Sequence, residues 1–229
     1  MICIPIAGTQ TPEVIEKIRR ASLLADIIEL RIDRIPGADL GRLLAARHTP
    51  VIVTNRCRKE GGGFVGTEEE RVELLKEAVR LGADYIDIEA ATDPALKKGL
   101  RETLVGSSSQ LIVSWHDFSG TPSAEFLKAK LTGCMADGPA IVKIVTHAAI
   151  TADCLRLLEL IPYARQRDQA IIAFCMGRPG KISRIMAPML GSVFSYASLE
   201  PEEASAPGQM TIHQMREIYR IMDERQSNE

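Results

Sequence analysis

The sequence lacks a charge excess of either sign. It carries 28 lysines and arginines against 30 aspartates and glutamates, a formal net charge of -2. No overall electric field therefore attracts nucleic acid or an anionic membrane. Aromatic residues make up only 4% of the chain, with a single tryptophan, which argues against a surface that stacks single-stranded nucleic acid. We expect no nucleic-acid partner, and any function that depends on charge must be local.

Long apolar runs and paired cysteines are also missing. No stretch approaches the roughly 18 to 20 apolar residues that span a bilayer, and no basic region precedes the short apolar stretch at the N-terminus. We therefore expect a cytoplasmic protein without membrane association. The five cysteines are scattered with no Cys-x-x-Cys pair, so the sequence predicts neither a disulfide framework nor a zinc site. No histidine pair has metal-ligand spacing, and no metal is expected.

The chain repeats one unit, a short β-branched apolar run followed by a longer segment with helical spacing. The strand candidates are Ile2–Ala7, Ile27–Asp33, Val51–Arg56, Tyr85–Ala90, Leu111–Asp117, Ala140–His147, Ile171–Met176 and Val193–Ser198. Helix start signals between them are Thr11-Pro12, Thr67 with Glu70, Thr121-Pro122 and Thr151 before Asp153. The best-defined helix covers Thr67 to Leu81, ahead of Gly82, and the last one covers roughly Thr211 to Arg225.

Strict alternation of strands and helices predicts a parallel sheet, and eight such units use the whole chain. We therefore expect a single (β/α)8 TIM barrel, one domain over residues 1–229, with a frayed tail near Gln226 to Glu229. A doubly wound open sheet is the structural alternative. It would usually carry a glycine fingerprint after its first strand, whereas this turn reads Ala7-Gly8-Thr9-Gln10-Thr11-Pro12.

Polar residues of one parity recur on five strand candidates. They are Glu29, Arg31 and Asp33; Thr54 and Arg56; Asp87 and Glu89; Ser114 and His116; and Lys143. Residues two apart share a face of a strand, and the outer face of a barrel packs against helices, so this parity is expected to face the axis. Burying charges is costly. The charges are either a structural ion-pair network in the lower barrel or a functional site.

Lys143 and His116 favour the functional interpretation. Burial among apolar residues and other cations lowers the pKa of a lysine, which frees the amine to attack a carbonyl and form an imine. A histidine, with an unperturbed pKa of about 6.5, can move the protons that such chemistry requires. Lys143 is therefore the candidate nucleophile and His116, on the neighbouring strand, the candidate acid and base. A carboxylate from an adjacent loop, such as Glu60, would fix the tautomer of His116.

Three loop features bear on the substrate. Arg184 follows the seventh strand candidate and is suited to bidentate binding of a carboxylate, although a solvated surface arginine is equally consistent with the pattern. Gly61-Gly62-Gly63 opens no helix in the manner of a phosphate loop, and we interpret it as a flexible turn. Glu200 to Gln209 is long for a connection between a strand and a helix, which is typical of a lid.

Six segments carry a further pattern. They are Glu29-Leu30-Arg31-Ile32-Asp33, Thr54-Asn55-Arg56 with Glu60 beyond it, Ser114-Trp115-His116-Asp117-Phe118, Val142-Lys143-Ile144, Met176 to Ser183-Arg184, and Ala204-Ser205-Ala206-Pro207-Gly208-Gln209. In order and spacing, these segments resemble those of the type I 3-dehydroquinate dehydratases of the shikimate pathway. The resemblance covers almost the whole chain, and Phe174 stands where some members carry methionine.

The resemblance implies a reaction and roles for particular residues. Lys143 would form a Schiff base with the ketone of 3-dehydroquinate. His116 would remove the C2 proton and protonate the departing C1 hydroxyl, so that water is lost and 3-dehydroshikimate forms. By the same resemblance, Glu60 orients His116, Arg184 and Gln209 hold the carboxylate, Ser205 closes over it, Met176 belongs to the apolar wall, and Glu29, Arg31 and Arg56 contact ring hydroxyls. The family implies no metal or organic cofactor, and commonly a homodimer.

Two other functions remain open at this stage. A class I aldolase also works through an imine on a barrel, but such enzymes usually handle phosphorylated sugars, and the sequence shows no phosphate cradle near the last two strands. A catalytically silent protein that binds a cyclic acid would keep the fold, although a binder does not need Lys143, His116 and Glu60 together.

Overall fold

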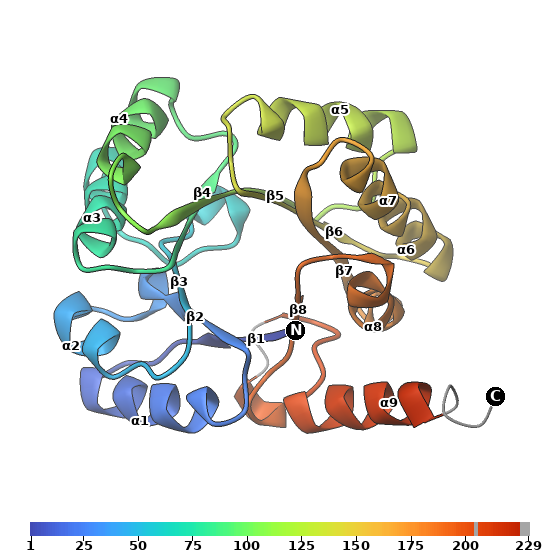
Figure 1. Cartoon of the computed structure of the whole chain (residues 1–229), viewed down its shortest axis with the longest axis horizontal. Helices are drawn as coiled ribbons and strands as arrows, with labels where there is room; N and C mark the ends of the chain where they lie inside the picture. The colour runs from blue at the N-terminus through green and yellow to red at the C-terminus, as the bar shows by residue number, and fades with distance from the viewer. Residues whose placement is uncertain (204–205, 225–229) are drawn as a thin grey trace.

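Eight parallel strands form the centre of the molecule, and helices surround them (Figure 1). The computed structural model describes residues 1–203 and 206–224, so the expected frayed tail and Ser205 lie outside the described residues. The strands are β1 (Ile2–Ile6), β2 (Ile27–Arg31), β3 (Val51–Thr54), β4 (Tyr85–Glu89), β5 (Gln110–Asp117), β6 (Ile141–His147), β7 (Ala170–Met176) and β8 (Ser195–Tyr196). The helices are α1 (Thr11–Ser22), α2 (Leu40–Ala45), α3 (Glu68–Arg80), α4 (Pro94–Leu104), α5 (Ala124–Met135), α6 (Thr151–Leu158), α7 (Leu160–Arg165), α8 (Lys181–Leu190) and α9 (Ile212–Glu224).

The strand order confirms the (β/α)8 barrel. Strands β1 to β7 are hydrogen-bonded in sequence order, and β8 pairs with β1 on the other side. The amide of Val193, just before β8, donates to the carbonyl of Ile171 in β7 at 2.9 Å, so the ring is nearly closed. A doubly wound sheet reverses its strand order near the middle. The open-sheet alternative is therefore wrong.

Local signals set most of the helix starts. Thr67 and Glu70 form a capping box, in which the Thr67 hydroxyl accepts from the Glu70 amide at 3.2 Å and the Glu70 carboxylate accepts from the Thr67 amide at 2.8 Å. The signal at Thr121-Pro122 is wrong by two residues. Ser123 caps α5 instead, because the Thr121 hydroxyl is already engaged as a donor to the carbonyl of His147 at 2.9 Å.

Three strands are at least two residues shorter than the sequence predicts. Strand β2 ends at Arg31, where a 3₁₀ turn over Ile32–Arg34 begins, β3 ends at Thr54, and β8 covers only Ser195–Tyr196. Arg31 and Thr54 are the last partners in the β2–β3 register. Beyond them side chains replace the ladder, as when the Asp33 carboxylate accepts from the Gly63 amide at 3.0 Å. At the carboxyl ends of β2 and β3, the barrel is thus built from tethered loops rather than extended strands.

Two apolar clusters fill the barrel on either side of the strands. The larger one lies between strands and helices and includes Ile28, Leu30, Val142 and Ile144. The smaller one uses the opposite parity and includes Ile27, Ile52, Ile112, Ile141 and Ile172. Because Glu29 and Lys143 share that parity two residues further along, the charged side chains sit above a floor of isoleucines. The charged side chains do form an ion-pair network, but it lies above this floor and not in the lower barrel, where the sequence interpretation placed it.

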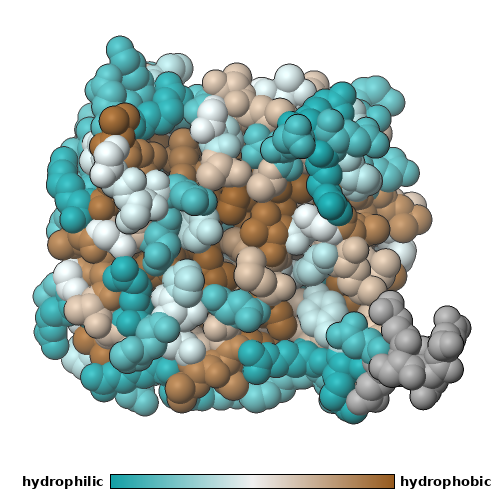
Figure 2. Space-filling model, viewed as in Figure 1, coloured by the Kyte–Doolittle hydropathy of each residue, from teal (hydrophilic) through white to brown (hydrophobic). Residues whose placement is uncertain are grey.

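The outer surface is mixed. Seen down the barrel, polar side chains cover much of the surrounding helices, and apolar atoms are visible between them (Figure 2). None of the helices in the described part of the chain is both long and apolar enough to cross a membrane.

Candidate active site

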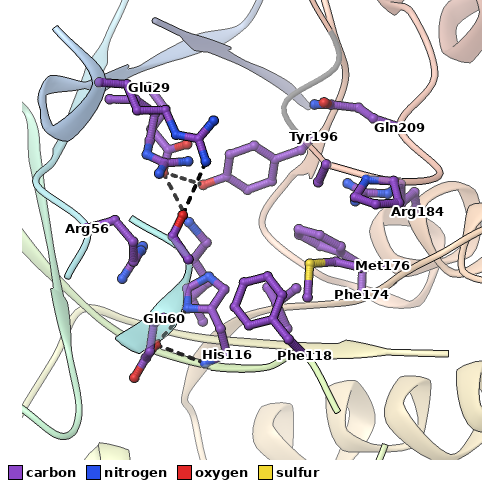
Figure 3. A pocket seen from close by; sticks show the side chains of 17 residues that line it. Glu29, Arg56, Glu60, His116, Phe118, Phe174, Met176, Arg184, Tyr196 and Gln209 are labelled. Atoms are coloured by element: carbon purple, nitrogen blue, oxygen red, sulfur yellow. Dashed lines mark hydrogen bonds and ion pairs between the residues drawn. The ribbon is translucent and has the colours of Figure 1, made fainter. Parts of the chain in front are cut away.

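A cavity opens at the carboxyl ends of the strands. Side chains from β2, β5, β6, β7, β8 and the loops between strands and helices point into it (Figure 3). The sequence-predicted residues that line it are Glu29, Arg31, Arg56, Glu60, His116, Lys143, Met176, Arg184 and Gln209. Residues that lie far apart in the chain thus meet in one cavity, and of the predicted set only Ser205 cannot be placed within the described residues.

Lys143 lies at the inner end of the cavity and is only 4% exposed. Its Nζ donates to Glu29 Oε1 at 3.1 Å and to Asp87 Oδ2 at 3.0 Å. Its direct partners are therefore carboxylates, rather than the cations that the sequence interpretation placed beside it. Burying an ammonium group without such partners would cost several kcal/mol, so the carboxylates are what allows a lysine at this position.

Arg56 contacts Asp87, the partner of Lys143, and also binds residues of β4 and β5. Its Nη2 contacts Asp87 Oδ2 at 2.8 Å, and its Nη1 donates to Glu89 at 2.9 Å and to the Ser114 hydroxyl at 2.6 Å. Burial alone would raise the pKa of Asp87, but Arg56 and Lys143 together hold it well below its usual range. Asp87 therefore stays a carboxylate and keeps Lys143 and Arg56 in place.

His116 and Glu60 form a hydrogen-bonded pair in the same cavity. Glu60 Oε2 lies 2.8 Å from His116 Nδ1 and accepts from the backbone amide of His116 at 3.0 Å. Burial lowers the pKa of His116 well below its ordinary value, and the nearby Arg56 and Lys143 lower it further. Because Oε2 already accepts one N–H, we assign the ring proton to Nδ1, which leaves Nε2 with a free electron pair. The imidazole is thus poised as a base.

Glu60 itself is an unusual carboxyl group. Burial raises its pKa to about 7, a rise that Arg56 partly opposes. Its position depends on the glycine run that follows it. A Cβ atom on Gly62 would lie 1.8 Å from the carbonyl oxygen of Arg56, so only glycine allows the chain to pass so close. The run predicted to be a flexible turn is therefore a tightly packed one.

Arg184 carries a buried charge, and no acidic residue within 1–203 and 206–224 forms an ion pair with it. It lies in the first turn of α8, is 1% exposed, and its guanidinium stacks 4.4 Å from the ring centroid of Phe174. Its Nε and Nη2 atoms are buried and have no hydrogen-bond partner among the described residues. Burial lowers its pKa to about 10. The alternative of a solvated surface arginine is wrong, and unpaired buried donors at a cavity point to an anionic ligand.

The loop after β8 reaches the same cavity. Ala206, Pro207 and Gln209 line it, and the Gly177 amide donates to the Pro207 carbonyl at 3.0 Å. Gly208 has a φ of +80°, and a Cβ atom there would lie 2.1 Å from the carbonyl oxygen of Gly177. Glycine is therefore required for this loop to pack on the end of β7. The part of the expected lid that the structure describes lies against the cavity.

Three residues in or near the cavity were not predicted from the sequence. Phe118 stacks on His116, with 6.4 Å between ring centroids. Tyr196 lines the cavity beside Lys143. Arg71, from α3, contacts Glu89 at 2.7 Å and donates to the carbonyl of Asn55. Phe118 lies inside the Ser114–Phe118 segment that carries the family resemblance and could have been included, whereas Arg71 has no local signal.

Metal-ligand groupings are absent from the described residues. Within 1–203 and 206–224, no group of three or more His, Cys, Asp or Glu side chains is arranged to hold a metal ion.

Comparisons with known proteins agree on a family. A sequence model of type I 3-dehydroquinase matches residues 2–226. A 3-dehydroquinate dehydratase from Dehalococcoides mccartyi is 41% identical over 216 residues, covering 94% of this chain and 93% of the relative. The solved 3-dehydroquinate dehydratase of Geobacillus kaustophilus has a TM-score of 0.90 at 27% identity, covering 97% of this chain and 91% of that one.

A second solved relative carries a covalent ligand. The type I enzyme of Clostridium difficile, solved with covalently modified comenic acid, has a TM-score of 0.89 at 26% identity and covers 97% of this chain and 92% of that one. The family match over nearly the whole chain and the curated relatives above 30% identity lead to one conclusion. This chain belongs to the type I 3-dehydroquinase family.

Proposed function

We propose that this chain is a 3-dehydroquinate dehydratase, a hydro-lyase that forms 3-dehydroshikimate through an imine on Lys143. The observation that carries the proposal is a buried lysine at the inner end of the cavity, with the His116–Glu60 pair lining the same space. A nucleophilic amine and a neutral imidazole are the two groups that this chemistry needs.

The first half of the reaction builds the imine. The Lys143 ammonium gives up a proton, and Glu29 is the hydrogen-bonded carboxylate that accepts it, while Asp87 stays ionised and holds the nitrogen in place. The free amine attacks the C3 ketone, and the carbinolamine loses water to leave a cationic imine. This positive charge withdraws electrons and makes the neighbouring C2 proton acidic.

The second half removes water from the ring. Nε2 of His116 takes the C2 proton, the electron pair forms the new double bond, and the C1 hydroxyl leaves with the proton that His116 returns. Hydrolysis of the imine consumes the water lost in the first half, so one water is released overall. Glu60 keeps the imidazole oriented through both transfers, because it contacts Nδ1 and the backbone amide together.

The remaining cavity residues bind the substrate in this proposal. Arg184 and Gln209 hold the carboxylate, Ser205 closes over it, and Met176 forms part of the apolar wall. Glu29, Arg31 and Arg56 contact ring hydroxyls. The reaction needs no metal or organic cofactor. The homodimer and the cytoplasmic location suggested by the resemblance stay predictions.

Replacing Arg184 with alanine is expected to raise KM by about 10-fold to 100-fold, the range for losing hydrogen bonds to a charged group, with a smaller change in kcat. The measurement is steady-state kinetics with 3-dehydroquinate. Arg178→Ala is the matched control, because Arg178 lies in the loop just before α8 and is exposed. An unchanged KM in Arg184→Ala would exclude Arg184 as the carboxylate partner.

The proposed function is tested with 3-dehydroquinate itself. The ultraviolet absorbance of the enone product is followed in one sample, and a second sample is reduced with borohydride and mapped by peptide mass. We expect enone to form and a substrate-derived mass to appear on Lys143. Enone without an adduct would exclude the lysine mechanism and keep the dehydratase. Carbon–carbon cleavage products would indicate the aldolase, and no reaction would indicate the silent binder.

A further inference from the structure

We propose that the aromatic ring of Tyr196 stabilises the positive charge on the Lys143 nitrogen during the reaction, which makes Tyr196 a further catalytic residue. This inference rests on the proposed imine. It assigns a role to a residue that the sequence analysis did not select, and it gives the short strand β8 a part in the chemistry.

Tyr196 lies against the reacting nitrogen. The centroid of its ring is 4.7 Å from Lys143 Nζ, and its hydroxyl donates to Glu29 Oε1 at 3.4 Å. Figure 3 shows the side chain pointing across the cavity toward Glu29. Tyr196 is only 5% exposed, and a cation over a ring is attracted most strongly where water is excluded.

Two other aromatic residues hold the ring in this position. Phe174 and Phe194 contact it with centroid distances of 5.4 and 5.6 Å, at interplanar angles of 51° and 64°. Burial and the nearby Glu29 raise the pKa of Tyr196 well above its ordinary value. Tyr196 therefore remains a neutral phenol, which presents its ring to Lys143 and keeps its hydroxyl as a donor.

The ring matters because the Lys143 nitrogen loses N–H donors when the ammonium group becomes an imine. An ammonium group has three N–H donors, and Lys143 uses two of them for Glu29 and Asp87. A protonated imine is planar and keeps one N–H, so one of these two hydrogen bonds is lost while the positive charge remains. Attraction to the ring needs no N–H and persists through the step.

The hydroxyl of Tyr196 supports the same step. When the imine keeps its N–H on Asp87, Glu29 loses the lysine donor. Glu29 Oε1 then still accepts from the Thr54 hydroxyl at 2.9 Å and from Tyr196. The carboxylate thus stays hydrogen-bonded while the neighbouring nitrogen reacts, which limits the cost of leaving it buried.

The test varies the negative electrostatic potential of the ring face at position 196 with little change in the shape of the side chain. Phenylalanine and phenylalanines bearing increasing numbers of fluorine atoms are placed at position 196, and the Lys143 adduct trapped by borohydride is quantified. Tyr196→Phe is expected to stay within about threefold of the parent. Adduct accumulation is expected to fall stepwise with fluorination, by about 10-fold at the pentafluoro ring.

Position 126 provides the control. Phe126 lies on α5 and does not line the cavity, so fluorination there tests the general effect of a fluorinated phenylalanine, and its adduct yield is expected to stay constant. Two results would overturn the role of the ring. One is an adduct yield that does not change with fluorination at position 196, and the other is an adduct yield that falls as much in Tyr196→Phe as in Tyr196→Leu. No adduct in the parent protein would instead show that the proposed imine fails, and this inference with it.

Discussion

Replacing Lys143 with alanine is expected to abolish the borohydride-trapped adduct and to lower kcat by on the order of 10⁴-fold to 10⁶-fold, as loss of a covalent nucleophile does elsewhere. The reason is that the remaining cavity groups can bind the substrate but cannot make the C2 proton acidic. The measurement is single-turnover enone formation at saturating 3-dehydroquinate, followed by peptide mass mapping.

The Lys143 variant needs a control for folding. Alanine leaves Glu29 and Asp87 without their shared cation, and breaking a buried pair costs roughly 3 to 5 kcal/mol of unfolding free energy. Lys143→Arg restores a cation that cannot act as an amine nucleophile, and its thermal unfolding is expected to lie closer to that of the parent. A folded Lys143→Ala or Lys143→Arg protein with substantial turnover would contradict the mechanism.

The barrel could be predicted from the sequence because two periodicities agree. Alternating strand and helix patterns gave the order of elements, and the shared parity of Glu29 and Lys143 showed which side chains face the axis. Strand ends could not be predicted, since they depend on side chains that meet only after folding. Asp33 illustrates this, because its carboxylate binds Arg31 and the distant Gly63 amide, which ends the regular part of β2.

The unpredicted residues share a physical cause. Tyr196 lies within the strand candidate Val193–Ser198 but carries no charge, so the parity of charged residues did not select it. Arg71 stands beside the apolar stripe of α3, and its partners Asn55, Glu89 and Thr92 come from other parts of the chain. Parity also placed Asp87 on the inner face without indicating that it contacts Lys143. Local patterns therefore indicate which face a side chain occupies, and the partners follow from the closure of the barrel.

Replacing His116 with alanine is expected to leave imine formation intact and to lower kcat by about 10²-fold to 10⁴-fold, or more, because His116 serves two proton transfers. The mass of the trapped adduct separates imine formation from the later loss of water. The adduct trapped on Lys143 is expected to have the mass of the substrate imine, one water heavier than that of the product imine. Normal turnover, or an adduct already dehydrated, would assign the base to another residue.

The contact between Glu60 and His116 is expected to make kcat/KM depend on pH. In the parent protein, kcat/KM is expected to fall as pH decreases through about 7, the pKa to which burial raises Glu60, because a protonated Glu60 no longer places a negative charge beside the imidazole to stabilise the imidazolium formed when His116 takes the C2 proton. The neutral Glu60→Gln variant keeps an oxygen that accepts the Nδ1 proton but cannot titrate. This variant is expected to be slower than the parent and not to show the fall of kcat/KM below about pH 7.

If the variant still shows this fall at low pH, another group titrates. The pH dependence would then be that of His116 itself, whose pKa lies below its ordinary value. Because the two groups are in contact, only the variant separates their titrations.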